Sequence, residues 1–249
     1  PANTWSGDFL AAWHLQDSDL SAPADSATAV ADNSGFALVS GGTSAPAEST
    51  PGLIGGGLKS LKGVSHRVEI NNAAHLEDKN EATFSFWYRR DASGGETSDI
   101  FAHDAPGIIR RIGHDWEGFA HDDGIGFYPR VASGTIDQPD LWSGTLSIGE
   151  WRHVAVTQDT TSGKGDFRLY IDGVEVDAAL DKNLSTGDRG ILEPNFLLGS
   201  TAGAKPENTM PKASLDEMRM AGAVRSAAWV KAEYLSMSDP QTFGSFSPL

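Results

Sequence analysis

The chain has 249 residues, and 34 acidic against 19 basic side chains give it a net charge of -15. This charge repels nucleic-acid phosphates and anionic membrane surfaces and attracts divalent cations, so we expect neither nucleic acid nor membrane insertion. No cysteine is present, which excludes a disulfide scaffold and agrees with a bacterial exported protein. No run approaches the roughly 18 apolar residues of a membrane span, and we interpret the start, which lacks a signal-peptide pattern, as that of a mature protein.

The length fits a single all-β domain over residues 1–249, because β-sandwiches commonly use about 200 to 250 residues as one unit. Residues 21–57 are rich in Ala, Ser, Gly, Thr and Pro and predict loops around one or two weak strands. The strand signals sharpen from residue 83. The runs 83–90 and 151–158 both alternate with the period of two that indicates a sheet strand.

The strongest local signal is Asp172-Gly173, which separates the alternating runs 167–171 and 174–176. An Asp-Gly pair in this position predicts a two-residue β-hairpin. Polar and Gly-rich clusters separate further strand candidates at the spacing of a sandwich. These candidates are 66–70, 124–131, 196–200 and 215–220.

One helix is expected, over residues 227–238, with Ser226 as its N-cap and Pro240 after its end. Its larger apolar residues fall near one face and are Trp229, Val230, Tyr234 and Met237. Many short strands followed by one helix predict an all-β sandwich of two antiparallel sheets with one short C-terminal helix.

Three motifs stand in a characteristic order: Trp151-Arg-His-Val-Ala-Val-Thr157, then Leu169-Tyr-Ile-Asp-Gly173, then Leu215-Asp-Glu-Met-Arg-Met220. Together they resemble the bacterial laminin-G-like family of the concanavalin A-like lectin and glucanase superfamily. Further similar segments lie at 12–15, 32–35, 58–70, 82–89 and 225–234. The resemblance implies a concanavalin A-like jelly roll in an extracellular or cell-surface protein, as part of a larger multidomain protein.

The same resemblance implies a structural calcium ion held by an early acidic loop and by the late Asp-Glu strand. The matching positions are Asp32, Asn33, Asp216 and Glu217, and Asp17 flanks the same early loop. Calcium takes about six to eight oxygen ligands, which carboxylates and carbonyls from distant segments can supply. The alternative is that these are ordinary acids at turns and strand ends, where Asp is common.

The region 103–130 is dense in polar and aromatic residues and basic for so acidic a chain. Aromatic faces pack on the C–H surface of sugars, and Arg binds carboxylate or sulfate with two hydrogen bonds. We therefore expect carbohydrate, in particular acidic polysaccharide, or another cell-surface ligand as the partner. The candidate binding residues are Arg110, Arg111, His114, Trp116 and Arg130, together with Trp142 in an expected loop at 139–143.

Two other interpretations stay open for this region and for the chain. Alternating Arg, His and Asp are also what the solvated face of an antiparallel sheet shows, and Trp116 can be a core residue. A structural spacer or adhesion domain would then need no glycan site.

Catalysis is the second alternative, because the same sandwich hosts glycoside hydrolases and polysaccharide lyases. Hydrolases need paired carboxylates, and two pairs have suitable spacing: Asp115 with Glu117, and Glu175 with Asp177. The longer hydrolase and lyase motifs are absent, so we expect a non-catalytic module. His153 is expected to be a structural residue of its strand.

Overall fold

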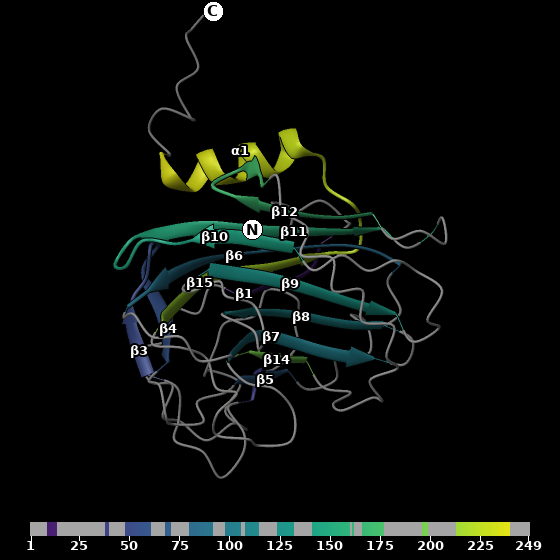
Figure 1. Cartoon of the computed structure of the whole chain (residues 1–249). Helices are drawn as coiled ribbons and strands as arrows, with labels where there is room; N and C mark the ends of the chain where they lie inside the picture. Colours follow the sequence, from purple (N-terminus) through teal and green to yellow (C-terminus); the bar gives the residue numbers. More distant parts are fainter. Residues whose placement is uncertain are drawn as a thin grey trace, which may run out of the picture.

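The computed structural model describes residues 9–13, 38–39, 48–60, 68–70, 80–91, 98–105, 108–114, 124–131, 141–159, 161, 166–176, 196–198 and 213–239. Within these ranges the chain forms two antiparallel sheets and one helix (Figure 1). No helix in this part of the chain has the length and apolar character that a membrane span requires.

The first sheet has eight strands, and the long strands β6 and β15 lie in its middle. Its strands are β1 (Phe9–Trp13), β3 (Glu48–Pro51), β4 (Gly56–Ser60), β6 (Glu81–Arg90), β11 (Trp151–Asp159), β12 (Asp166–Ile171), β13 (Val174–Glu175) and β15 (Ala213–Ala221). Their order is β13-β12-β11-β6-β15-β4-β3, and β1 also pairs with β15. Segments from both ends of the sequence therefore meet on β15.

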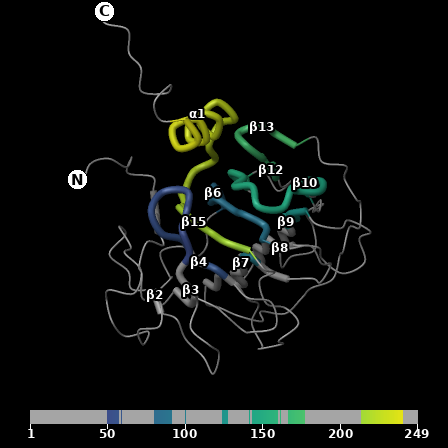
Figure 2. Tube along the Cα trace, turned by 90° about the vertical axis from the view of Figure 1, so that its left-hand side faces the viewer, coloured from purple at the N-terminus to yellow at the C-terminus, as the bar shows by residue number. Residues whose placement is uncertain are grey.

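The second sheet has seven strands. They are β2 (Leu38–Val39), β5 (Val68–Ile70), β7 (Ser98–Ala105), β8 (Ile108–His114), β9 (Gly124–Val131), β10 (Leu141–Thr145) and β14 (Phe196–Leu198). Their order is β10-β9-β8-β7-β14-β5-β2. Figure 2 shows β4, β15, β6, β12 and β13 of the first sheet one after another, in the order of their pairing.

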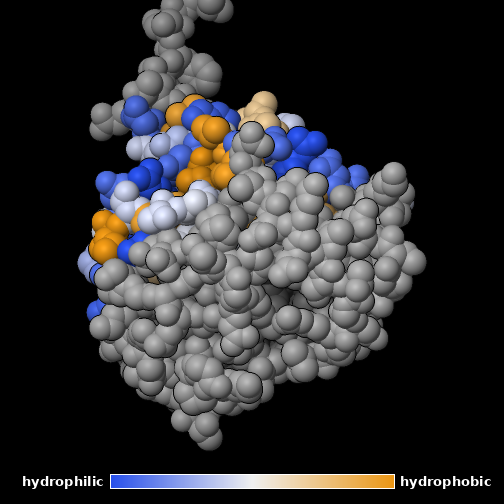
Figure 3. All heavy atoms as spheres, viewed as in Figure 1, coloured by the Kyte–Doolittle hydropathy of each residue, from blue (hydrophilic) through white to orange (hydrophobic). Residues whose placement is uncertain are grey.

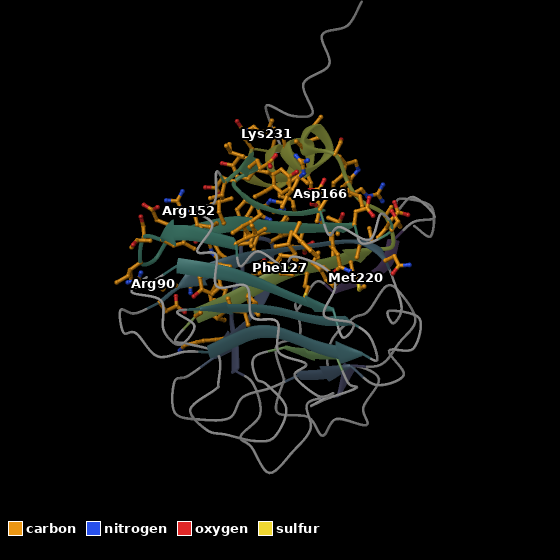
Figure 4. The ribbon with its side chains drawn as sticks, turned by 45° about the vertical axis from the view of Figure 1, so that its right-hand side comes forward. Arg90, Phe127, Arg152, Asp166, Met220 and Lys231 are labelled. Carbon is orange, nitrogen blue, oxygen red and sulfur yellow. The ribbon has the colours of Figure 1, made fainter. Side chains whose placement is uncertain are left out.

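The core lies between the two sheets, and β6 supplies its largest side chains. Phe84, Phe86 and Tyr88 are at most 1% exposed. Phe127 of β9 is also fully buried and packs against Phe167 of β12, with 6.1 Å between the ring centroids. Figure 4 shows Phe127 in this position between the sheets. Burial of each such ring stabilises the fold by roughly 1.5 to 3 kcal/mol.

Helix α1 (Ala227–Ser238) covers the outer face of the eight-stranded sheet, above β11 and β12 in Figure 1. The predicted bounds and N-cap are confirmed, since Ser226 Oγ accepts a hydrogen bond from the Trp229 amide at 3.2 Å. Because α1 covers β6, the residues that alternate with its core side chains are buried as well. Ser85 is 3% exposed and Trp87 is 2% exposed.

The predicted strand 124–131 is confirmed as β9, and the other three candidates overlap β5, β14 and β15. The prediction of a loop around Trp142 is wrong, because Leu141–Thr145 forms β10 and Trp142 pairs with Gly126. The turn signal of Pro139 and Asp140 precedes this strand and does not include Trp142.

The predicted Asp-Gly hairpin connects β12 and β13. Both of its central residues have positive φ, 52° at Asp172 and 70° at Gly173, as the tight hairpin turn requires. The turn lies directly under α1. A Cβ atom at Gly173 would be 2.8 Å from the Lys231 Cα atom, so only glycine allows the helix to approach this closely.

We predict that Gly173→Ala lowers the free energy of unfolding by about 3 kcal/mol, as the sum of positive-φ strain and displacement of α1. Gly144→Ala is the matched control, because Gly144 has a φ of 73° but no atom within 4 Å of the added Cβ. The control should cost about 1 kcal/mol in urea unfolding. Equal losses in the two variants would contradict close packing of the turn on α1.

Candidate functional site

A buried layer of charged residues lies between α1 and the eight-stranded sheet. Glu233 Oε1 accepts hydrogen bonds from Arg219 Nη1 at 2.9 Å and from Ser85 Oγ at 3.0 Å. Arg219 Nη2 also donates to Glu217 Oε2 at 2.7 Å. Two carboxylates therefore share one guanidinium, and none of the three side chains is more than 8% exposed.

His153 of β11 lies beside this layer and is completely buried. Its Nε2 atom is 3.4 Å from Glu233 Oε2, and its ring meets Trp87 edge-on with 5.3 Å between the centroids. Tyr234 of α1 lies on another side of the ring, at 6.1 Å. This burial agrees with the predicted structural role of His153 in its strand.

The pKa of Glu233 shows that the layer stabilises a charged carboxylate. Burial on its own would raise the pKa of Glu233. The contact with His153 and the charges of His153 and Arg219 outweigh this effect and hold the pKa of Glu233 below its usual range. Glu233 is therefore ionised in the folded protein near neutral pH and anchors α1 to the sheet.

This layer is not open to a substrate, because α1 covers both of its carboxylates. Of the acids considered for hydrolysis, Asp115, Glu117 and Asp177 lie outside the described residues. Glu175 is exposed on β13 and pairs with Arg168, 3.2 Å from Oε2 to Nη1. Glu217 and Glu233 thus take part in buried ion pairs, and Glu175 takes part in a surface ion pair.

Asp216 lies in β15 at a β-bulge, where the pairing with β6 shifts between Asp216 and Arg219. Its Oδ2 atom accepts the Ile54 amide at 2.9 Å, and its Oδ1 atom accepts the Glu217 amide at 2.8 Å. A Cβ atom at Gly52 would be 2.5 Å from the same Oδ2 atom. Asp216 therefore holds the turn between β3 and β4 against the sheet.

Burial raises the pKa of Asp216 to about 6, and the charge of Glu217 adds to the rise. The hydrogen bond from the Ile54 amide acts in the opposite direction and offsets part of it. The carboxyl group is thus desolvated and surrounded by backbone N–H donors.

The predicted calcium ligands divide into two groups. Asp17, Asp32 and Asn33 lie outside the described residues. Asp216 accepts hydrogen bonds from backbone amides and Glu217 accepts one from the Arg219 guanidinium, so both have structural partners among the described residues. Within the described ranges, no group of three or more His, Asp or Glu residues could hold a metal ion. A calcium site built on the early loop stays a prediction.

The predicted glycan-binding residues lie mostly on neighbouring strands of the seven-stranded sheet, apart from Trp116, which is outside the described residues. On β8, Arg110 pairs with Pro129 and His114 pairs with Ile125. Since Ile125 is fully buried, this register assigns Arg110 and His114 to the same set of alternating positions as core residues.

The other three candidates share the opposite set of positions. Arg111 pairs with Tyr128, Arg130 pairs with Ile109, and Trp142 pairs with Gly126. These positions alternate along β9 with the core position of Phe127. The register therefore brings Arg111, Arg130 and Trp142 to one face of β8, β9 and β10, and separates them from Arg110 and His114.

A second, partly exposed cluster was missed by sequence reasoning. The Arg89 guanidinium lies over the Trp151 ring, 4.9 Å from its centroid. Arg89 Nε donates to Asp91 Oδ1 at 2.7 Å, and Ser214 Oγ donates to Asp91 Oδ2 at 2.7 Å. In the sequence Trp151 belonged to a strand motif, and nothing linked it to Arg89 before the pairing of β11 with β6 was known.

Comparison with known families decides the classification. Residues 62–231 match the Laminin_G_3 family, described as the concanavalin A-like lectin/glucanases superfamily. The chain belongs to this superfamily. The predicted concanavalin A-like sandwich is confirmed, together with the resemblance to laminin-G-like domains. No curated protein sequence matches this concanavalin A-like chain.

Solved structures share the fold at low sequence identity. One is domain 4 of AbnA, a GH43 extracellular arabinanase from Geobacillus stearothermophilus, in complex with arabinotriose. It is 20% identical to this chain with a TM-score of 0.58, and the match covers 90% of this chain and 96% of that one. The binding domain of Paraclostridial Mosquitocidal Protein 1 is 16% identical with a TM-score of 0.64, covering 93% and 53%. Trypanosoma rangeli sialidase is 15% identical with a TM-score of 0.60, covering 97% and 34%. The concanavalin A-like chain thus spans about half of the toxin domain and about a third of the sialidase.

We predict that Glu233→Gln destabilises this concanavalin A-like chain by about 3 kcal/mol at pH 7, because Arg219 and His153 lose a buried anionic partner. The folded-state pKa of Glu233 is lowered, so its contribution is present above the usual value of 4.5 and is lost as the pH falls below it. Urea unfolding at pH 7 and pH 4 should therefore show a smaller difference at pH 4. Glu175→Gln, on the exposed pair with Arg168, should change stability little at either pH.

We predict that Asp216→Ala lowers the melting temperature by about 5 °C, because buried amides lose their acceptor. The loss should be the same in calcium and in EGTA, as measured by scanning calorimetry. Asp166→Ala, at an exposed ion pair, is the control. If calcium raises the melting temperature of the wild type but not of Asp216→Ala, then Asp216 is a calcium ligand after all.

Proposed function

We propose that this chain is a non-catalytic, extracellular or cell-surface recognition module that binds an acidic polysaccharide through the seven-stranded sheet. The observation that carries the proposal is the register of β8, β9 and β10. It assigns Arg111, Arg130 and Trp142 to one set of positions, opposite the set that includes buried Ile125 and Phe127.

The two sheets differ in what lies on their outer faces. On the eight-stranded sheet, α1 covers Ser85, Trp87 and His153, and it closes that part of the face to ligands. In Figure 3 the described surface around α1 is a mixture of hydrophilic and hydrophobic residues. The outer positions of the seven-stranded sheet carry the two Arg residues and the Trp residue named above, which favours that face as the binding surface.

The composition of these positions favours an anionic sugar. Directly paired residues on neighbouring strands lie about 5 Å apart. Arg111 pairs with Tyr128, and Arg130 follows Tyr128 by two residues on β9, so the two Arg positions lie within the span of one or two sugar rings. A guanidinium binds carboxylate or sulfate with two charge-assisted hydrogen bonds. An aromatic ring at Trp142 would add apolar contact with the sugar. The net charge of the chain, -15, makes such a local basic group distinctive.

The structural neighbours support carbohydrate as the ligand class and an extracellular location. One is a domain of an extracellular arabinanase solved with arabinotriose, and others are binding domains of toxins. Their identity to this chain is at most 20%, so they support the proposal only through the shared fold. Membership of a larger multidomain protein is part of the same proposal, because these domains are themselves parts of larger proteins by name.

Enzymatic activity is the weaker alternative. Among the described residues, Glu217 and Glu233 are buried around Arg219, and the exposed carboxylates of Asp166 and Glu175 are both held in ion pairs with Arg168. A hydrolase would need an accessible pair. We therefore expect no release of reducing ends and no unsaturated uronate product from acidic polysaccharides, even at high protein concentration.

We predict that the wild type binds a sulfated or uronate polysaccharide in calorimetry and that binding weakens at higher salt. Arg111→Ala and Trp142→Ala should each lower the affinity about tenfold. Arg168→Ala is the charge-matched control, because Arg168 is an exposed Arg on the eight-stranded sheet. Equal affinity in all four proteins, or binding that ignores salt, would remove the site from this face.

A further inference from the structure

A row of polar residues crosses the eight-stranded sheet just beyond the C-terminal end of α1. In the register, Trp151 of β11 pairs with Arg89 of β6, Arg89 pairs with Ser214 of β15, and Ser214 pairs with Lys59 of β4. Paired residues of antiparallel strands share one face, so the row lies on one side of the sheet.

This side is the outer one, on which α1 lies. Arg89 alternates with buried Tyr88 and shares its face with Ser85 and Trp87, which both contact α1. Trp87 Nε1 donates to Met237 Sδ at 3.3 Å, and α1 ends one residue later at Ser238. Arg89 is two residues beyond Trp87 along β6, so the row begins where the helix stops. Arg90 and Arg152, which follow Arg89 and Trp151, lie at this end of the sheet in Figure 4.

The Arg89 side chain is held in one orientation. Asp91 accepts from its Nε atom at 2.7 Å, Ser214 accepts from its Nη2 atom at 3.1 Å, and the Trp151 ring lies under the guanidinium. Ser214 in turn donates to the second Asp91 oxygen, which closes the network. The side chains of Arg89 and Asp91 are nevertheless each 22% exposed. This fixed pair of a guanidinium and a carboxylate, called the fork below, therefore faces the solvent.

The fork keeps unused hydrogen-bonding capacity. Arg89 Nη1 and Trp151 Nε1 have no hydrogen-bond partner among the described residues. Each Asp91 oxygen accepts one hydrogen bond and has a further lone pair. Donors, acceptors and an aromatic ring therefore meet within one small surface, which is the combination that sugar hydroxyls and sugar C–H groups require.

We propose that Trp151, Arg89 and Asp91 form a second binding site, which takes an uncharged sugar residue. Hydroxyl oxygens accept from Arg89 Nη1 and Trp151 Nε1, and a neighbouring hydroxyl donates to Asp91. The charge of Arg89 is balanced by Asp91, and nearby Arg152 is balanced by Asp172 and Glu150. An anion thus gains no net attraction from Arg89 or Arg152, in contrast to the ligand proposed for the seven-stranded sheet.

Preorganisation supports this assignment. Binding usually costs entropy for each flexible side chain that becomes ordered, and Arg is among the most flexible. Here the protein has already fixed Arg89 through Asp91, Ser214 and Trp151. A comparable surface Arg without a ring is Arg168, which lies between Asp166 and Glu175 and is 46% exposed.

The test uses neutral xylo-, arabino- and gluco-oligosaccharides with the full chain, followed by calorimetry and tryptophan fluorescence. We expect one of these series to bind, with an affinity that does not change between low and high salt. Trp151→Ala and Arg89→Ala should each weaken binding about tenfold, whereas Arg168→Ala leaves it unchanged. Asp91→Asn should weaken binding as well, because it releases the guanidinium.

Folding is checked on every variant by its melting temperature. Should Trp151→Ala unfold, Trp151→Phe and Arg89→Lys replace the alanine variants; both should still weaken binding, since they remove the indole N–H and the planar fork. Failure of all three neutral series to bind the wild type, or unchanged affinity in the folded variants, overturns this site. Neither result bears on the acidic-glycan proposal, which has a different ligand charge, a different sheet and different variants.

Discussion

The attachment of α1 to the sheet depends on one buried carboxylate. Glu233 is the only residue of the helix that meets Ser85, Arg219 and His153 together, on three different strands. A buried charge is costly unless it is paired, so these contacts favour one position of the helix on the sheet. Close contact at Gly173 then fixes the other side of the helix, where a side chain would meet Lys231. Together they close the outer face of β6, β11 and β15.

The β-bulge in β15 makes this arrangement possible. Glu217 adopts a φ of 50°, a conformation that costs a non-glycine residue about 1 to 3 kcal/mol. The extra residue lets Asp216 accept the Ile54 amide, while Glu217 and Arg219 form their ion pair in the charged layer under α1. One local distortion therefore links the turn between β3 and β4 to the helix on top of the sheet. This linkage gives Asp216 and Glu217 a structural role in the sheet.

The sequence predicts the regular parts of this fold well, because their signals are local. The hairpin at Asp172-Gly173 and the helix with its Ser226 cap both follow from neighbouring residues. The burial of Trp87 and Ser85 could not be predicted in this way, since it depends on a helix about 150 residues later in the chain. The same limit applies to the candidate sites: Arg110 and Arg111 alternate along their strand, but only the pairing with β9 shows which of them shares positions with the buried Ile125 and Phe127.

Closure of the helix-covered face also determines where recognition can occur. A two-sheet sandwich has two outer faces, and α1 occupies the middle of one of them with buried ion pairs that a ligand cannot reach. The described part of that face continues beyond Ser238, and the opposite sheet provides the other outer face. The region beyond Ser238 holds the ion pair of Arg89 and Asp91 against Trp151, and the opposite sheet holds the strand positions of Arg111 and Arg130. Because the helix covers the middle of one face, its docking limits the surface on which the proposed sites can lie.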